Sequence, residues 1–326
     1  MGRENAKKTI YINIRGGLGN QLFCYFNGEF IKFKYNVQVK YIYNAKSNAH
    51  DKVNSRINSF NLGSNFIDTK SLKFYLTIIK LASRNLFSRK KKSASIVKTQ
   101  NRKSHLLFDQ IYDEKFLGFQ KEGEAITNWL HSSKSKEFYL RGLFQDFHYF
   151  DNQPQKKLDL KNSSQWYKQF AHECGSANPI ILHIRLGDYL KDNGGTLGVL
   201  SLEYYKSAVD LLRAKYPYNQ VWVFSNQTTK AKMLLMPIVD KSFKFVYEAE
   251  DKDPAEVLLA MSMGNALITS NSTFSLWSAK MSNNLSSIVV PDPFFKALPI
   301  YSQSFGNSWV KLKSKWLTQD EINQLS

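Results

Sequence analysis

The chain has 326 residues, of which 43% are hydrophobic, and its 45 Lys and Arg outweigh 27 Asp and Glu to give a formal net charge of +18. The apolar fraction excludes a disordered chain, and the length suits one large or two medium domains. Cys24 and Cys174 are too few for a disulfide-stapled fold, and neither has the spacing of a zinc site. The charge indicates an anionic partner: nucleic acid, a membrane surface or a phosphorylated ligand.

The N-terminal segment 1–8 is polar and leads directly into a strand pattern, which is not how a signal peptide is built. The most apolar stretch, residues 72–87, is interrupted by Lys73, Lys80 and Arg84 and is too short to span a bilayer. We therefore expect a cytoplasmic protein with reduced cysteines.

The first half of the chain begins with a strand, a turn, a helix and a second strand. These are predicted at residues 9–14, 16–19, 21–35 and 37–43. The segment from about 45 to 105 is polar and rich in Asn and Lys, with one amphipathic helix predicted at 71–87.

The second half alternates strands and helices with short connections. Strands are predicted at 180–184, 220–224, 244–247 and 266–269, and helices at 202–214, 254–263 and 274–281. This alternation predicts a parallel sheet built from right-handed βαβ units. The linker-like segment 151–165 is a candidate domain boundary, and Thr318 with Glu321 forms a capping box for a terminal helix.

The first candidate motif is the Gly-rich segment 16–21, which lies between a predicted strand and a predicted helix. Glycines allow positive φ and close backbone approach, and the following helix N-terminus presents free N–H groups to an anion or a sugar. The alternative is a plain strand-to-helix turn.

The second motif is the segment 183–189. His183 and Arg185 share one face of a strand and lie near its carboxyl end, where open α/β sheets bind ligands. A guanidinium grips a diphosphate through parallel hydrogen bonds, and Asp188 could orient Arg185 or act as a base. The alternative is a local Arg185–Asp188 ion pair beside a core histidine.

Two further segments are rich in groups that bind anions or metals. The hydroxyl-rich segment 270–275 could cap a helix, bind a phosphate at its N-terminus, or both. The pair Asp251 and Asp253 resembles a metal-binding D-x-D, but Asp253 precedes Pro254, with Glu256 in the first turn, which favours a helix start.

The basic residues of segment 89–103 have no aromatic residues among them. Binding of nucleic acid usually needs that interleaving, so this composition favours attraction to anionic lipid or a solvated loop.

Taken in order, these segments resemble the inverting α-1,2-fucosyltransferases of glycosyltransferase family 11. The segments that carry the resemblance are 16–23, 142–145 with 149–150, 183–189 with 204–205, 223–225, and 261–262 with 271–279. The resemblance covers nearly the whole chain except about 45–105.

The resemblance implies an α/β fold similar to GT-B, with two Rossmann-like domains facing across a cleft. The N-terminal domain, on the acceptor side, would span residues 1–160 and include a basic insertion at about 45–105. The C-terminal domain, which binds the donor nucleotide, would span 161–315, and a terminal helix 316–326.

The implied enzyme is a galactoside α-1,2-fucosyltransferase. It would move L-fucose from GDP-β-L-fucose to O2 of a terminal galactose in a surface polysaccharide or oligosaccharide, without a metal or other cofactor. The alternatives are another nucleotide-deoxysugar donor or acceptor hydroxyl on the same fold, or an inactive basic protein that binds anions or nucleic acid.

The expected partners are the GDP-sugar donor and a galactose-containing glycan acceptor. Contact with the anionic inner face of the cell membrane is expected to be peripheral, and nucleic acid is not expected.

The resemblance also implies roles for individual residues. It places Arg185, which would hold the departing β-phosphate, in the catalytic group with His183 and Asp188. Donor binding falls to Gly17, Gly19, Asn20, Gln21, Arg185, Ser225, Asn226, Asn271, Ser272, Thr273, Phe274 and Ser275. The general base stays open among Asp188, His183, Asp146 and the leaving phosphate.

The chain departs from the family pattern at three positions: Leu186 replaces a second Arg, Asn226 an Asp, and Leu276 a Trp. A carboxylate could read the N1–H and N2–H of guanine together, whereas Asn226 offers a single carbonyl oxygen.

Overall fold

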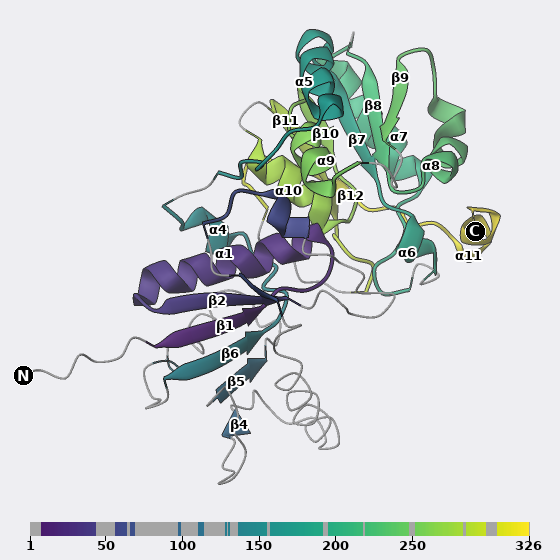
Figure 1. The fold of residues 1–326 in the computed structure, drawn as a ribbon. Coiled ribbons are helices and arrows are strands. Elements are labelled where there is room, and N and C mark those ends of the chain that lie inside the picture. The colour runs from purple at the N-terminus through teal and green to yellow at the C-terminus, as the bar shows by residue number, and fades with distance from the viewer. Residues whose placement is uncertain are drawn as a thin grey trace, which may run out of the picture. The chain divides into compact units, whose positions relative to one another are not determined.

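The computed structural model describes residues 8–43, 56–63, 66–68, 97–98, 110–113, 128, 130, 136–154, 157–191, 195–217, 219–247, 252–282, 285–297 and 305–325. The chain divides into two units, each with its own six-stranded sheet (Figure 1). Unit 1 comprises Met1–Asn58 and Leu62–Lys156, and unit 2 comprises Ser59–Asn61 and Lys157–Ser326. The predicted helix 71–87 and the basic run 89–92 lie outside the described residues.

The sheet of unit 1 has the strand order β3-β2-β1-β6-β5-β4, parallel except for β4. Its strands are β1 Thr9–Asn13, β2 Gln38–Tyr43, β3 Phe66–Asp68, β4 Val97–Lys98, β5 Gln110–Asp113 and β6 Glu137–Arg141. The helical elements are α1 Leu18–Tyr35 and α4 His148–Asp151, and the 3₁₀ turn η1 Arg56–Ser59 crosses into unit 2.

Helix α1 packs against the sheet of unit 1 at Gly28, where an added Cβ would overlap the Tyr41 ring and the end of Ile12. The Tyr41 hydroxyl donates to the Tyr25 carbonyl, 3.0 Å away, and so ties the helix to β2. The helix ends at Asn36, whose φ of 49° is the left-handed conformation common after helix C-termini.

The sheet of unit 2 has the strand order β12-β11-β10-β7-β8-β9 and is parallel throughout. Its strands are β7 Ile180–Ile184, β8 Val221–Ser225, β9 Phe243–Tyr247, β10 Ala266–Ile268, β11 Ser287–Asp292 and β12 Val310–Lys313. Numbered within the unit, this is the order 6-5-4-1-2-3 of a doubly wound fold, and the strand order reverses between β7 and β10.

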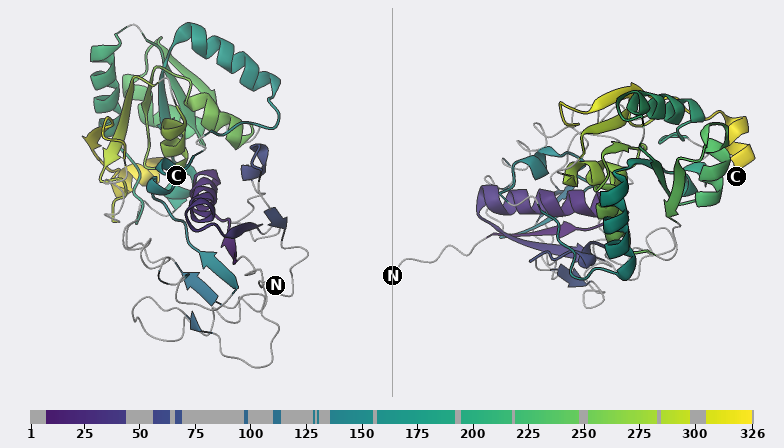
Figure 2. Two further views of the ribbon diagram at one scale, coloured as in Figure 1. Left: turned by 90° about the vertical axis from the view of Figure 1, so that its left-hand side faces the viewer. Right: turned by 90° about the horizontal axis from the view of Figure 1, so that it is seen from above.

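The helices of unit 2 follow the strands in alternation (Figure 2). They are α5 Gln165–Ala177, α6 Gly187–Lys191, α7 Leu202–Lys215, α8 Thr228–Leu235, η3 Met236–Ile238, α9 Pro254–Met261, α10 Thr273–Met281 and α11 Gln319–Leu325.

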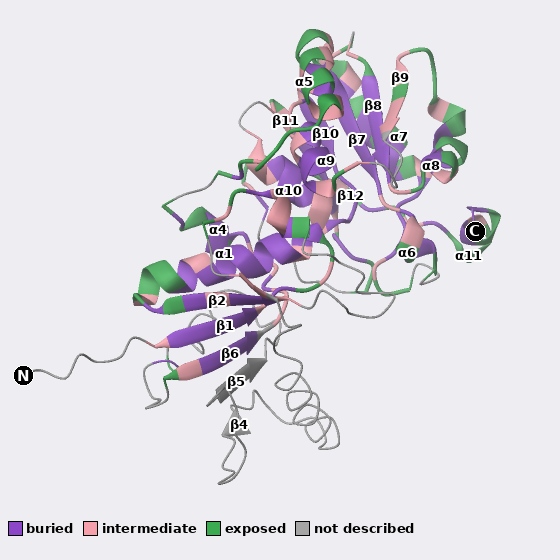
Figure 3. Ribbon diagram, viewed as in Figure 1, coloured by how far each residue is buried: buried purple, intermediate pink, exposed green. Residues whose placement is uncertain are grey.

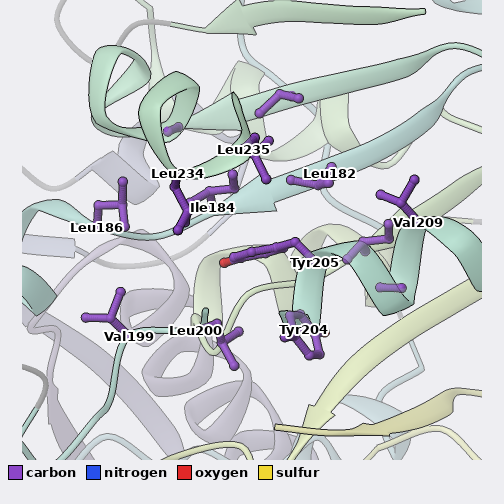
Figure 4. Close-up of a cluster of buried hydrophobic side chains, with 14 of the residues drawn as sticks. Leu182, Ile184, Leu186, Val199, Leu200, Tyr204, Tyr205, Val209, Leu234 and Leu235 are labelled. Atoms are coloured by element: carbon purple, nitrogen blue, oxygen red, sulfur yellow. The ribbon is translucent and has the colours of Figure 1, made fainter. Parts of the chain in front are cut away.

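Different helices pack on the two faces of the unit 2 sheet. Leu182 and Ile184 of β7 pack with Tyr205 and Val209 of α7 and Leu235 of α8 (Figure 4). On the other face, the Phe170 ring of α5 lies 5.3 Å from the Trp222 ring and 5.6 Å from the Phe224 ring of β8. The central strands β7, β8 and β10 are therefore buried on both sides (Figure 3), as expected from their largely apolar sequences.

The fold class of two Rossmann-like α/β domains is confirmed by the two sheets. The described parts of the predicted strands and helices are confirmed to within a few residues. Elements that the prediction omitted include α5, α8, β6, β11 and β12. Across the residues described, the structure contains no helix with the length and apolar character needed to cross a bilayer.

Two predicted helix caps are confirmed. Asp253 Oδ1 accepts the Ala255 N–H at 2.8 Å, and Pro254 occupies the first position of α9. At α11, Glu321 accepts hydrogen bonds from the N–H and hydroxyl of Thr318, which completes the capping box.

Candidate active site

The candidate active site of unit 2 lies where its strand order reverses. β7 and β10 are parallel neighbours, with Leu182 opposite Ile268, so their carboxyl ends meet at one edge of the sheet. Open α/β sheets bind ligands in the crevice outside this point. The segments after β7, β8 and β10 carry most of the site residues predicted from the sequence.

His183 links the two central strands. Its Nδ1 lies 2.8 Å from the Ser270 Oγ, and both residues are buried. Burial, with a smaller contribution from the Arg185 charge, lowers the pKa of His183 to about 3. His183 is therefore a neutral, hydrogen-bonded imidazole at neutral pH.

Arg185 and Asp188 form an ion pair at the surface of the same edge. The Arg185 Nη2 lies 2.7 Å from the Asp188 Oδ1, and the two side chains are 31% and 59% exposed. The guanidinium also lies 5.7 Å from the Tyr189 ring centroid. An exposed pair contributes about 0–1 kcal/mol, so a diphosphate could replace the carboxylate at little cost.

The segment after β8 contacts the segment after β7. Asn226 Oδ1 accepts the Leu186 N–H at 3.0 Å. Next to it, the buried Ser225 Oγ accepts the Gln227 N–H at 3.1 Å. Both side chains therefore bind backbone groups within unit 2.

Asn271 braces the segment after β10. Its Nδ2 donates to the carbonyls of Leu197, at 2.8 Å, and Gly198, at 3.0 Å, and its own carbonyl accepts from the Tyr189 hydroxyl at 3.0 Å. The Tyr204 hydroxyl donates to the Thr269 carbonyl at 2.9 Å. Burial raises the pKa of both tyrosines, so their hydroxyls stay protonated as donors.

The hydroxyl-rich segment starts α10. Ser272 Oγ accepts the Phe274 N–H at 3.3 Å, which confirms the capping role, and Ser275 Oγ donates to the carbonyls of Ser270 and Ser272. Thr273 and Phe274 are half-buried in the first turn, and the Phe274 ring lies 5.8 Å from that of His183.

Two buried oxygens at the end of β10 have no hydrogen-bond partner among the described residues. They are Thr269 Oγ1 and Asn271 Oδ1. Because a buried polar atom without a partner costs about 1–3 kcal/mol, both are acceptors that a ligand hydroxyl or a water could satisfy.

In unit 1, the Gly-rich motif lies at the equivalent edge of the other sheet. Gly16 has a φ of 74°, which favours glycine, and Gly17 precedes α1 without a side-chain cap. Gln21 is buried: it donates to the Gly16 carbonyl at 2.9 Å and accepts the Ile57 N–H at 3.1 Å. The Gln21 side-chain amide therefore fixes the Gly-rich turn. Gly19, which lies in the first turn of α1, is also buried.

A second motif meets the Gly-rich turn. Asn20 Oδ1 accepts from Gln145 Nε2 at 2.7 Å, and Cys24 Sγ lies 3.4 Å from the Gly142 carbonyl. β1 and β6 are parallel neighbours, so the segments that follow them approach each other in unit 1.

The predicted site residues thus fall into two groups. Gly17, Gly19, Asn20 and Gln21 belong to unit 1. Arg185, His183, Asp188, Ser225, Asn226, Asn271, Ser272, Thr273, Phe274 and Ser275 lie in unit 2, at one edge of its sheet.

The predicted site residues omit three that brace the site: Ser270, Tyr189 and Tyr204. Ser270 is adjacent to Asn271 in the hydroxyl-rich segment, so its position in that segment is the sequence feature that could have identified it.

The D-x-D pair forms no cluster in the described residues. Asp251 lies outside them, and Asp253 Oδ2 accepts from the Ser59 hydroxyl at 2.7 Å while Oδ1 caps α9. No group of three or more His, Cys, Asp or Glu side chains within the described ranges could hold a metal ion.

The chain is similar to two proteins of Escherichia coli. It is 24% identical over 325 residues to the O-antigen biosynthesis glycosyltransferase WbnK, covering 93% of this chain and all of that protein. It is 22% identical over 314 residues to an α-1,2-colitosyltransferase, and the match covers 94% of this chain and 98% of that protein. Among solved structures, the chain aligns with the Bradyrhizobium α-1,6-fucosyltransferase NodZ, soaked with GDP-fucose. The TM-score is 0.49 at 12% sequence identity, and the alignment covers 85% of this chain and 93% of NodZ.

The sequence pattern of Glycosyl transferase family 11 matches residues 9–313. This range includes both sheets, the Gly-rich turn of unit 1 and every candidate site residue of unit 2. The chain belongs to glycosyltransferase family 11.

Proposed function

We propose that this family 11 glycosyltransferase moves L-fucose from GDP-β-L-fucose to O2 of a terminal galactose, with inversion, as a galactoside α-1,2-fucosyltransferase. The observation that carries the proposal is the position of Arg185. Its side chain is 31% exposed where the strand order of unit 2 reverses, and its guanidinium is paired with the exposed carboxylate of Asp188 beside the Tyr189 ring. That position suits a nucleoside diphosphate.

The proposed reaction is a single displacement. The acceptor oxygen forms a bond to C1 of fucose while the bond from C1 to the β-phosphate oxygen breaks. The electron pair of that bond leaves with GDP, and the acceptor proton passes to a base. Since negative charge grows on the diphosphate, a cation fixed beside it stabilises the transition state more than the ground state.

The residues around Arg185 suit this chemistry in different ways. His183 is buried and its Nδ1 is engaged by Ser270, so we propose that it supports β7 and β10 and is not the base. Asp188 is exposed, and its carboxylate is released when the diphosphate takes over Arg185. Thr269 Oγ1 and Asn271 Oδ1 could accept hydrogen bonds from hydroxyl groups of the donor.

We further propose that no metal takes part. Arg185 and the N–H groups at the start of α10 would supply positive charge to the diphosphate. Asp253, the described member of the D-x-D pair, already uses both carboxylate oxygens within unit 2.

A second candidate donor carries colitose, which is L-fucose without its 3-hydroxyl. One of the two relatives from Escherichia coli is an α-1,2-colitosyltransferase. A donor of this kind would use the same Arg185 and the same displacement, and would differ only in how the sugar ring is bound.

The test is acceptor-dependent release of GDP by the purified protein. GDP-fucose and GDP-colitose are each supplied with a β-galactoside and with its 2-deoxy analogue. Release from GDP-fucose that needs the galactose 2-hydroxyl supports the proposal. Release only from GDP-colitose selects the second donor, and no release from either donor contradicts both.

A further inference from the structure

Asn226, the first residue after β8, turns its side chain back toward the segment that follows β7. Its Oδ1 accepts the Leu186 N–H at 3.0 Å. Leu186 is fully buried, so this N–H would lose its partner if the acceptor were removed. Since Leu186 directly follows Arg185, the bond fixes the backbone next to the proposed phosphate ligand.

Gly187 is shaped to admit the Asn226 side chain. A Cβ at position 187 would overlap Asn226 Nδ2 and lie 3.4 Å from Cγ and 3.9 Å from Oδ1. The φ of Gly187 is not among the positive ones, so space and not backbone conformation requires glycine here. Asn226 and Gly187 therefore form one fitted contact.

We propose that Asn226 is a positioning residue that holds the Leu186–Gly187 turn, and with it Arg185, and that it does not select the nucleobase. This inference rests on the proposed function. The amide has one acceptor oxygen, which binds Leu186, and its nitrogen lies against Gly187. No other interaction of Asn226 is needed to account for where its side chain lies.

Arg185 needs this external support. Both side chains of its ion pair with Asp188 reach solvent, with 31% of Arg185 and 59% of Asp188 exposed. Ion pairs of this kind hold a long side chain only weakly in place. The backbone at Leu186 is instead held by a part-buried hydrogen bond from the segment that follows β8. A displacement of about 1 Å of a charged group can slow a reaction about 100-fold, so a bond of this kind can matter to the rate.

The first test is a double-mutant cycle of Asn226→Ala and Gly187→Ala, measured as kcat for GDP release. Each single variant should lower kcat about tenfold, because each removes the Leu186 bond. In the double variant the three atoms nearest the new Cβ are gone, so kcat should stay within about twofold of Asn226→Ala alone. Multiplicative losses, about 100-fold together, would overturn the proposal.

Gly175→Ala is the matched control. Gly175 lies on α5 of the same unit, and a Cβ there would meet nothing within 4 Å. This variant should keep the wild-type kcat. Its stability should equal or slightly exceed that of the wild type, because alanine lowers the conformational entropy of the unfolded chain.

The second test separates positioning from base recognition. Affinities for GDP and for IDP, which lacks the 2-amino group of guanine, are measured by calorimetry for wild type and Asn226→Ala. An unchanged ratio of the two affinities is expected. A ratio that falls toward one in the variant would show that Asn226 reads guanine and would overturn the proposal.

The third test does not depend on the donor. Amide hydrogen exchange resolved at Leu186 should be faster in Asn226→Ala and in Gly187→Ala than in wild type or Gly175→Ala. If the wild type binds no GDP, the proposed function fails, and this exchange measurement alone decides whether Asn226 holds the turn. Unchanged exchange in both variants would overturn the positioning role.

Discussion

Lowering the pH from 7 to 5 should destabilise the protein through His183. The histidine is 4% exposed, and its pKa in the native state is about 3 against the usual value near 6.5. Between those values the unfolded chain binds a proton that the native state excludes, so stability falls as the pH falls. With 1.36 kcal/mol per pH unit below 6.5, His183 should lower the free energy of unfolding by about 2 kcal/mol at pH 5.

The assay is urea denaturation of wild type and His183→Gln at pH 7 and pH 5, followed by tryptophan fluorescence. Five of the six tryptophans lie in unit 2, which carries His183. All other titratable groups are shared, so the pH-dependent loss should be about 2 kcal/mol larger in wild type than in the variant. Equal losses, or an imidazole NMR signal of His183 that titrates near pH 6.5, would refute the reasoning.

Three further predictions concern other parts of the chain. Glu256 is buried and accepts hydrogen bonds from the N–H and hydroxyl of Ser164 at the start of α5. Glu256→Ala should therefore lower the free energy of unfolding by about 1–3 kcal/mol. A loss below about 0.5 kcal/mol in urea denaturation would contradict this role. Transfer should continue at the same rate in EDTA, whereas a strict need for Mn²⁺ or Mg²⁺ would refute metal independence. Neutralising Lys90, Lys91 and Lys92 should weaken sedimentation with anionic vesicles without slowing turnover on soluble acceptors, and unchanged sedimentation would count against a membrane role.

The elements that could be predicted from the sequence have strong local signals. The buried strands 180–184 and 221–225 each carry four apolar residues in five, and the start of α9 is marked by Asp253 and Pro254. Such signals depend on a few neighbouring residues, so they can be recognised without knowledge of the tertiary contacts.

Helix α5 had a weaker signal. Only Phe170 and Cys174 of its 13 residues are buried, so the apolar stripe is a single pair one turn apart. Its start is fixed instead by Ser164, which Glu256 holds from 92 positions away. β12 is similarly hidden, because most of its residues are exposed and two of the four are lysines.

The chemistry-bearing residues of the site could be located from the sequence, but their contacts could not. Arg185 and Asp188 are three positions apart, so their ion pair is a local feature. The bonds from Asn226 to Leu186 and from His183 to Ser270 join positions 40 and 87 apart and depend on the strand order of unit 2. The donor-binding role of Asn226 is implied by the family resemblance and stays a prediction, because a sequence pattern does not specify where the side chain points.

The central claim is that Arg185 stabilises the departing diphosphate, and the direct test is the single-turnover rate of transfer in Arg185→Ala. Lys191→Ala is the matched control, because Lys191 is an exposed cation on the neighbouring helix α6. We predict that the Arg185 variant loses about 10²–10³ in rate at saturating donor while the Lys191 variant keeps the wild-type rate. A wild-type rate in Arg185→Ala, or equal losses in both variants, would contradict the account.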